Sequence, residues 1–341
     1  MAERQGSTTP GRIRLVDVAA HAEVSMKTVS NVVHGHPHVR PELRARVQAA
    51  IDELGYRPNL TARRLVTGRT GMLALALPEM DQPYFADLAR HVAELAPELG
   101  YRVVIEQTLN EMGAERAVIS DRENGLVDGV VFNPTQMSSD EIAGLRRDVP
   151  LVLIGEAARP TTTDHVMIDN VAAARDATAH LLTSGRRRVA FLGMVNGDPS
   201  DANALRLQGF RAAHAEIGVH ADPALVLTCT DYSVEAAAHA IETVVGRQQI
   251  DAVLCREDRF AIGAIRALTA AGLSIPDDVA VIGWDDTQIA RWSAPAITSV
   301  APDKRELARL ALGLVHERIS GYQGEGRHLI APHTLVLRES G

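Results

Sequence analysis

The segment RLVDVAAHAEVSMKTVSNVVHG, residues 14–35, carries the most informative pattern in the chain. Its apolar residues follow helical spacing in two blocks, one around Val18 and Ala22 and the other around Val29 and Val33. A short break at residues 23–25 separates the blocks, and its last residue is a serine, a residue type that favours the helix N-cap. The pattern predicts two short helices joined by a tight turn, as in a helix-turn-helix.

The second of these helices is expected to read DNA. In a helix-turn-helix it enters the major groove with its N-terminal residues at the base edges, which here include Lys27. A helical hairpin within a plain bundle is the alternative, but bundles need longer helices and would not place Lys27 on a small polar face. A third helix over residues 42–54, with Val47, Ile51 and Leu54, would complete a minimal core.

Charge is divided unevenly along the chain. Residues 1–70 hold 11 Lys and Arg against 6 Asp and Glu, a net charge of +5. Residues 71–341 hold 24 against 37, a net of −13, and together they give the overall −8. A basic N-terminal segment on an acidic remainder predicts a polyanionic partner for the first 70 residues alone. Chance clustering on a solvated surface is the alternative interpretation.

Length and composition set the broad class. A chain of 341 residues is too long for one core, so two or three domains are expected. Its content of 46% hydrophobic and 23% charged residues is ordinary for a soluble globular protein. No apolar run approaches the roughly 18 residues of a membrane span, and the N-terminus lacks a secretory signal pattern. Cys229 and Cys255 form no CxxC pair, so a cytoplasmic protein without membrane association is expected.

After residue 70 short apolar runs alternate with longer helical patterns. The expected strands are 72–77, 103–105, 129–132, 151–154, 189–192, 252–255 and 279–283. The expected helices are 86–96, 114–123, 172–182, 202–217, 236–245 and 261–271. This alternation predicts parallel sheets covered by helices, and its pause near residues 155–170 divides the region into two α/β lobes. A ligand would bind between them, outside the carboxyl ends of the strands.

Two stretches give the chain a family resemblance. VDVAAHAEVSMKTVSNVVHG (16–35) and AAIDELGYRPNLTARRLVTGRTG (49–71) resemble the DNA-binding head of the lactose-repressor (LacI) family of bacterial transcription regulators. The resemblance resumes in patches, such as GMLALALPEMDQPYFADLARHVAE (71–94), and spans essentially the whole chain. It implies a small all-α head and a two-lobed α/β body like that of periplasmic binding proteins, with three crossovers.

The resemblance also implies the domain boundaries. They are a disordered N-terminus over 1–11, a helix-turn-helix domain over 12–57, a hinge helix or linker over 58–70, and an effector-binding and dimerisation domain over 71–341. Within the last, the N-lobe would comprise about 71–170 and 302–327, and the C-lobe about 171–301 and 328–341.

The DNA-binding residues follow from the same resemblance. In the recognition helix they are Ser25, Met26, Lys27, Thr28, Ser30 and Asn31, with base contacts expected from Lys27 and Met26 and positioning from the others. In the hinge segment they are Asn59, Ala62, Arg63 and Leu65, with Leu65 as an apolar wedge in the minor groove. The alternatives are solvated surface residues, and for Leu65 a core leucine.

Two residues depart from the family pattern in the head. The usual turn glycine is replaced by Glu23, which tolerates a positive φ less well. The usual Ser or Thr cap of the third helix is replaced by Arg40 before Pro41. Both departures are expected to lower the stability of the head without removing the reading helix.

The resemblance places effector-binding residues in the body. They are Asp81, Tyr84, Phe85, Asp169, Arg206 and Asp285, with Glu257 at a position where the family commonly has Asn. Carboxylates and a guanidinium bind vicinal hydroxyls and aromatic faces stack on sugar C–H surfaces, so a sugar is the expected class. The alternatives are an aromatic core for Tyr84 or Phe85, an interlobe salt bridge for Arg206, and a helix cap for Asp285. Glu257 leaves a cationic or amino-bearing ligand open.

No catalytic pattern accompanies these residues. The GxGxxG, P-loop, GxSxG and HExxH motifs are absent from the sequence, so no enzyme activity, metal or cofactor is expected. The predicted function is a DNA-binding regulator, most simply a repressor, that acts as a homodimer on a palindromic operator and responds to a small-molecule effector. A regulator whose body responds to a partner protein is the alternative, followed by an enzyme on a sugar-binding scaffold.

Overall fold

The computed structural model describes residues 13–33, 36, 38–56, 69–120, 125–144, 149–156, 158, 160–195, 201–245 and 250–341. The chain divides into two compact units, Met1–Thr70 and Gly71–Gly341, which are called the head and the body and are treated separately. No helix among these residues is both long and apolar enough to cross a membrane.

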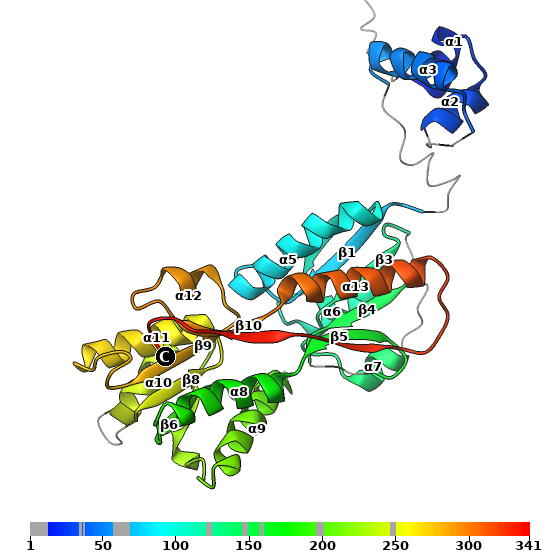
Figure 1. The fold of residues 1–341 in the computed structure, drawn as a ribbon. Coiled ribbons are helices and arrows are strands. Elements are labelled where there is room, and N and C mark those ends of the chain that lie inside the picture. Colours follow the sequence, from blue (N-terminus) through cyan, green and yellow to red (C-terminus); the bar gives the residue numbers. More distant parts are fainter. Residues whose placement is uncertain are drawn as a thin grey trace, which may run out of the picture. The chain divides into compact units, whose positions relative to one another are not determined.

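In the described part of the head, three helices pack around a small apolar cluster (Figure 1). They are α1 (Leu15–His21), α2 (Met26–Val33) and α3 (Pro41–Leu54). Val18, Val29 and Val47 contribute one fully buried side chain from each helix. The predicted pair of short helices is therefore confirmed, and α2 begins where Ser25 accepts a hydrogen bond from the backbone N–H of Thr28 at 3.1 Å.

Both departures from the family pattern leave structural consequences. Glu23 has φ of 50°, so a residue with a side chain occupies the left-handed conformation of the turn. Arg46 donates to its backbone carbonyl at 3.5 Å. Arg40 makes no side-chain cap for α3, which instead begins with Pro41 in its first turn and ends with Gly55 in the left-handed conformation.

The described residues of the body form two sheets of six strands each. The first, in the order β11-β5-β4-β3-β1-β2, is parallel throughout. Its strands are β1 (Met72–Leu77), β2 (Arg102–Gln107), β3 (Gly129–Phe132), β4 (Leu151–Ile154), β5 (Asp164–Ile168) and β11 (His328–Ala331).

The second sheet has the order β12-β10-β9-β8-β6-β7, and only β12 runs antiparallel to its neighbour. Its strands are β6 (Val189–Val195), β7 (Val226–Cys229), β8 (Ala252–Cys255), β9 (Ala280–Trp284), β10 (Thr298–Pro302) and β12 (His333–Val336). Each sheet and its helices form one lobe of the body.

Helices cover both faces of each sheet (Figure 1). In the first lobe α5 (Pro83–Leu95) and α13 (Lys304–Ile319) pack on one face, and α6 (Met112–Ser120) and α7 (Ser139–Gly144) on the other. In the second lobe α8 (Asn170–Thr183) and α9 (Asp201–Glu216) are opposite α10 (Val234–Val245) and α11 (Asp258–Ala270). A short helix, α12 (Gln288–Trp292), follows β9.

The structure corrects two predictions about the body. The expected pause at residues 155–170 contains strand β5, which lies between β4 and β11 and carries a buried aspartate and histidine within an otherwise apolar run. The segment from residue 328 was assigned to the C-lobe, yet β11 pairs with β5 of the first lobe and fills the edge of that sheet. The chain therefore returns to the second lobe after Ala331.

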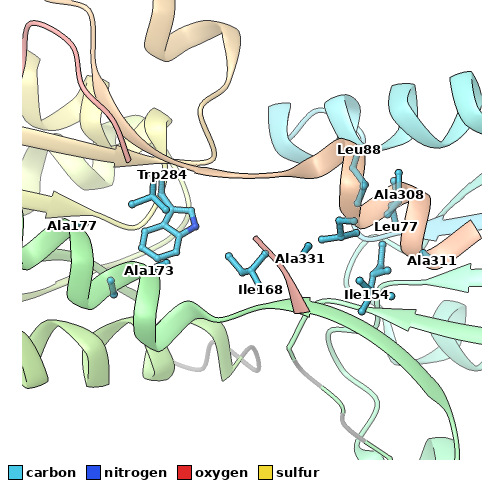
Figure 2. Packing of buried hydrophobic residues seen from close by; sticks show 14 of the residues in the cluster. Leu77, Leu88, Ile154, Ile168, Ala173, Ala177, Trp284, Ala308, Ala311 and Ala331 are labelled. Atoms are coloured by element: carbon cyan, nitrogen blue, oxygen red, sulfur yellow. The ribbon is translucent and has the colours of Figure 1, made fainter. Parts of the chain in front are cut away.

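Three crossings connect the lobes, and one apolar core continues past them. The chain crosses between β5 and α8, between β10 and α13, and between β11 and β12. Asp303 N–H donates to the carbonyl of Pro332 at 2.9 Å, which ties two crossings together. Figure 2 shows Ile168 and Ala331 between Trp284 on the second-lobe side and Leu77 on the first-lobe side, all within one buried cluster.

Two glycines in helices give a matched test of packing. Gly209 on α9 lies against α8, and a Cβ there would come within 2.1 Å of the carbonyl oxygen of Val171. Gly313 on α13 has no atom within 4 Å of such a Cβ. We expect Gly209→Ala to lower the free energy of unfolding by about 2–4 kcal/mol and Gly313→Ala to raise it by about 0.5–1 kcal/mol. Urea unfolding of both variants measures this, and equal effects would show that the α8–α9 contact is not close-packed.

Candidate effector cavity and DNA-reading helix

The exposed face of α2 carries the side chains that could reach bases. Met26 is 55% exposed and Lys27 is exposed, whereas Thr28, Ser30 and Asn31 are half-buried. The Ser25 hydroxyl also bonds the Thr28 hydroxyl at 2.9 Å, so its hydrogen bonds cap the N-terminus of α2. The predicted hinge residues Asn59, Ala62, Arg63 and Leu65 lie outside the described residues.

A cavity of about 330 Å³ lies between the two lobes of the body. It is built where strands end, because the carboxyl ends of parallel strands leave room for side chains from the following loops. Pro78 follows β1, Asn133 follows β3, Arg256 follows β8 and Asp285 follows β9. Ile168 and Pro302 contribute from two of the crossings.

Five of the seven predicted effector residues line this cavity. Tyr84 and Phe85 contribute from the start of α5, and Arg206, Glu257 and Asp285 contribute from the second lobe. Asp81 is exposed outside the lining, and Asp169 caps α8 by accepting the N–H of Ala172 at 2.9 Å. Arg256 also lines the cavity, whereas Trp292, which is 86% exposed, does not.

The sequence did not single out most of the polar lining. These residues are Gln82, Asn110, Asn133, Thr135, Gln136, Glu156 and Tyr232. Their shared feature is position, since each follows a strand of the structure by a few residues or stands at the start of a helix. Among these, the segment after β3 is fixed by buried Glu115, which accepts hydrogen bonds from the N–H groups of Thr135, Gln136 and Met137 at 2.7–3.1 Å.

Arg206 is fixed in the cavity wall by three contacts within its own lobe. Its guanidinium lies 4.0 Å above the ring of Trp284, its Nε donates to Asn170 at 2.8 Å, and its Nη1 donates to the carbonyl of Arg256 at 2.7 Å. Burial lowers the pKa of Arg206, and nearby Asp285 opposes this effect. These contacts favour a pre-positioned cation over the alternative of an interlobe salt bridge.

Asp285 is the carboxylate that faces this cation. Burial raises the pKa of Asp285 to about 7, although Arg206 and Lys304 act in the opposite direction. The hydroxyl of Tyr84 is nearby, and burial together with Glu156 and Asp285 raises the pKa of that phenol, which stays protonated. The cavity therefore offers a carboxylate acceptor and a phenol donor side by side.

The Glu257 charge is already partnered. Its carboxylate lies 2.9 Å from Nε of Arg259 and 3.9 Å from Nε of Arg256, whose guanidinium stacks 4.4 Å from the ring of Tyr232. This pairing weakens the case for a cationic ligand at that position. Amides, a carboxylate and aromatic edges together match a polyhydroxylated molecule that presents several hydroxyls and apolar C–H faces.

The part of the chain that the structure describes shows neither a metal site nor a reactive thiol. His, Cys, Asp and Glu side chains there form no group of three suited to a metal ion. Cys229 and Cys255 are both buried, and burial raises the pKa of the Cys229 thiol to about 11 and holds the pKa of the Cys255 thiol well above its usual range. Neither is a reactive thiolate.

Comparisons with known proteins also separate the head from the body. Residues 14–59 match the model of bacterial regulatory proteins of the lacI family, and residues 178–341 match the periplasmic binding protein-like domain. The transcriptional regulator CelR of Thermobifida fusca is 34% identical, aligned over 95% of this chain and 97% of that protein.

Two solved structures are similar over nearly the whole chain. A CelR–cellobiose complex is 31% identical, covers 97% of this chain and 100% of its own, and has a TM-score of 0.71. A lac repressor dimer bound to operator has a TM-score of 0.83 with 96% and 98% coverage, and at 24% identity it supports the fold.

The raised pKa of Asp285 predicts a pH-dependent stability. The folded pKa of about 7 exceeds the ordinary value of 3.8, so the stability that the protonated group contributes is lost as pH rises from about 4 to about 7. We expect Asp285→Asn to raise the free energy of unfolding relative to wild type by roughly 1–3 kcal/mol at about pH 8, with a smaller gain at about pH 5. Denaturant titrations at both pH values measure the difference. Exposed Asp277→Asn is the control, and a gain that does not grow with pH would contradict the assignment.

Proposed function

Because this chain belongs to the LacI family of bacterial transcription regulators, we propose that it is a repressor whose affinity for operator DNA is controlled by a small carbohydrate bound in the interlobe cavity. Its relatives are transcription regulators and the chain is not an enzyme. The observation that carries the proposal is the cavity itself, in which Arg206 and Asp285 of one lobe face Tyr84 of the other.

The head supplies the DNA-binding half of this function. A single head offers few base contacts, so a homodimer on a palindromic operator gives the necessary specificity. Lys27 can donate to guanine, and Met26 can contact a thymine methyl. Asn59, Ala62, Arg63 and Leu65 are proposed to follow the minor groove and phosphates, with Leu65 as the wedge. Such a protein would work in the cytoplasm, where its operator is.

The cavity supplies the sensing half. Its volume of about 330 Å³ is at the small end of ordinary ligand pockets, which suits a mono- or disaccharide. A ligand that touches Tyr84 in the first lobe and Arg206 in the second contacts both sides of the crossings. Its affinity then differs between lobe arrangements, which is what a ligand-controlled switch requires. The cellobiose of the CelR complex makes this disaccharide a first candidate to test.

Removing the buried cation tests the sensing half. A panel of mono- and disaccharides, including cellobiose, is screened by thermal shift and calorimetry on the full chain. We expect Arg206→Ala to weaken the binding of an identified carbohydrate by roughly 30- to 100-fold, because its hydroxyls lose a charged donor. Operator affinity without carbohydrate should change little. Exposed Arg211→Ala on the same helix is the matched control.

The contrary outcomes are also defined. If Arg206→Ala binds the carbohydrate as tightly as wild type, the cavity is not its site. If no carbohydrate of the panel binds and one protein co-purifies with the chain instead, the body responds to a protein partner.

Replacing Lys27 tests the reading helix. We expect Lys27→Ala to relax base preference at one position of each half-site at a cost of roughly 1–3 kcal/mol, because a donor to guanine is lost. Arg63→Ala, by contrast, should weaken binding to all sequences about equally, since phosphates carry no base identity. Selection from a random DNA library reports both effects. If Lys27→Ala returns the wild-type motif, its side chain does not read bases.

A further inference from the structure

A buried lysine stands where the chain enters the first lobe at its second crossing. Lys304 is the first residue of α13, which Asp303 caps by accepting the N–H of Glu306 at 2.8 Å. It is only 8% exposed, and lysines are rarely buried to this extent without partners for the ammonium. Its partners therefore show what this position does.

Those partners come from both lobes. The ammonium donates to the backbone carbonyl of Asp285 and lies 3.5 Å from the carbonyl of Asp286, both in the second-lobe loop after β9. It also lies 3.5 Å from a carboxylate oxygen of Asp87 on α5, in the first lobe. One side chain thus joins the cavity loop to the helix that carries Tyr84 and Phe85.

The loop that Lys304 holds is strained. Asp285 has φ of 93° and Asp286 has φ of 46°, a region that residues with a Cβ occupy at a cost. From the second-lobe side the loop is held at Asp286, whose N–H donates to Ser299 at 3.0 Å and whose carboxylate pairs with Arg291 at 3.1 Å and with Arg338. Because contacts from both lobes fix this loop, a change in the contacts on either side is expected to shift it.

Asp285 faces the cavity and Lys304 at once. Its carboxylate is in the cavity lining, and its carbonyl oxygen accepts from the ammonium. The carboxylate and the carbonyl belong to one residue, so a ligand that repositions the carboxylate also moves the peptide group to which Lys304 donates. The two lobes also approach closely at this point, around a hollow of about 10 Å³. It is lined by Gln82, Pro83 and Tyr84 of the first lobe and by Glu257, Asp258, Arg259, Asp285 and Thr287 of the second.

We propose that Lys304 is a positioning residue that couples the cavity loop at Asp285 to helix α5 of the first lobe. The inference rests on the proposed function only in assuming that a ligand moves the loop, because the contacts of Lys304 with Asp285 and Asp87 exist in the ligand-free protein. The competing role is purely structural: Lys304 would neutralise Asp87 while the shared apolar core carried any coupling between the lobes. The two roles differ in what a disturbance at Asp286 does to α5.

Hydrogen–deuterium exchange of the full-length, ligand-free protein separates these roles. Arg338→Met disturbs the loop from the second-lobe side, and Lys304→Met removes the proposed connection while keeping an aliphatic side chain. We expect Arg338→Met to accelerate exchange in residues 285–292 and, roughly three- to tenfold, in the first turns of α5. In the Lys304→Met background the same substitution should still accelerate 285–292 but change α5 by less than about twofold. Lys304→Arg should restore the effect on α5.

Two results would overturn the proposal. One is that Arg338→Met leaves α5 unchanged in the wild-type background. The other is that it changes α5 equally with and without Lys304. Circular dichroism verifies folding of each variant. If Arg338→Met does not fold, Asp286→Asn disturbs the loop more mildly, and if Lys304→Met does not fold, Asp87→Asn weakens the connection to α5 more mildly. No carbohydrate enters the experiment, so a failed carbohydrate screen would refute the proposed function without affecting this test.

Discussion

The body is organised by an apolar core that two lobes share across three chain crossings. Trp284 and the α8–α9 face lie on one side, α5 and α13 lie on the other, and Ile168 and Ala331 lie between them (Figure 2). Such a core resists separation of the lobes but leaves their strand ends facing each other. The loops at those strand ends therefore enclose a cavity, and polar groups in them can be buried there without disturbing the core.

The charges in that cavity have a stability cost that a ligand could relieve. Asp285 is held in a left-handed conformation with a pKa near 7, and burial disfavours the ionised form of Arg206 opposite it. Groups that are strained and incompletely neutralised in the free protein are common at binding sites, because the ligand supplies the missing partners. Lys304 connects this strained loop to the first lobe, so a change in the loop on ligand binding is expected to reach α5 as well.

Much of the fold was predictable because its signals are local. The two helices around Ser25 and strands such as β1 and β8 appear where apolar spacing and capping indicated. Strand β5 was missed because Asp164 and His165 interrupt its apolar pattern. Both are buried, and they bond to groups outside the strand, Asp164 to Arg318 and His165 to the carbonyl of Gly155. Pairing of that kind depends on tertiary structure and cannot be read from a window of neighbours.

The site was predictable only in part, for the same reason. Arg206 and Asp285 were expected from the family resemblance, whereas Asn133 and Tyr232 reach the cavity only because the sheet order brings their strand ends together. Asp169 was expected to bind effector, but the structure uses its carboxylate to cap α8. An aspartate just before a helix can serve either purpose, and sequence does not distinguish them.

The proposed control of operator binding by a carbohydrate requires that the cavity and the DNA-binding head are thermodynamically linked. Linkage is reciprocal: a carbohydrate that changes operator affinity by some factor must have its own affinity changed by the same factor when operator is bound. Calorimetric titration of a binding carbohydrate into the full-length protein, with and without a saturating operator fragment selected from random DNA, measures this directly. The expected result is a fold-change in carbohydrate affinity equal to the fold-change in operator affinity that the carbohydrate causes. Identical carbohydrate affinities in the two titrations would contradict it.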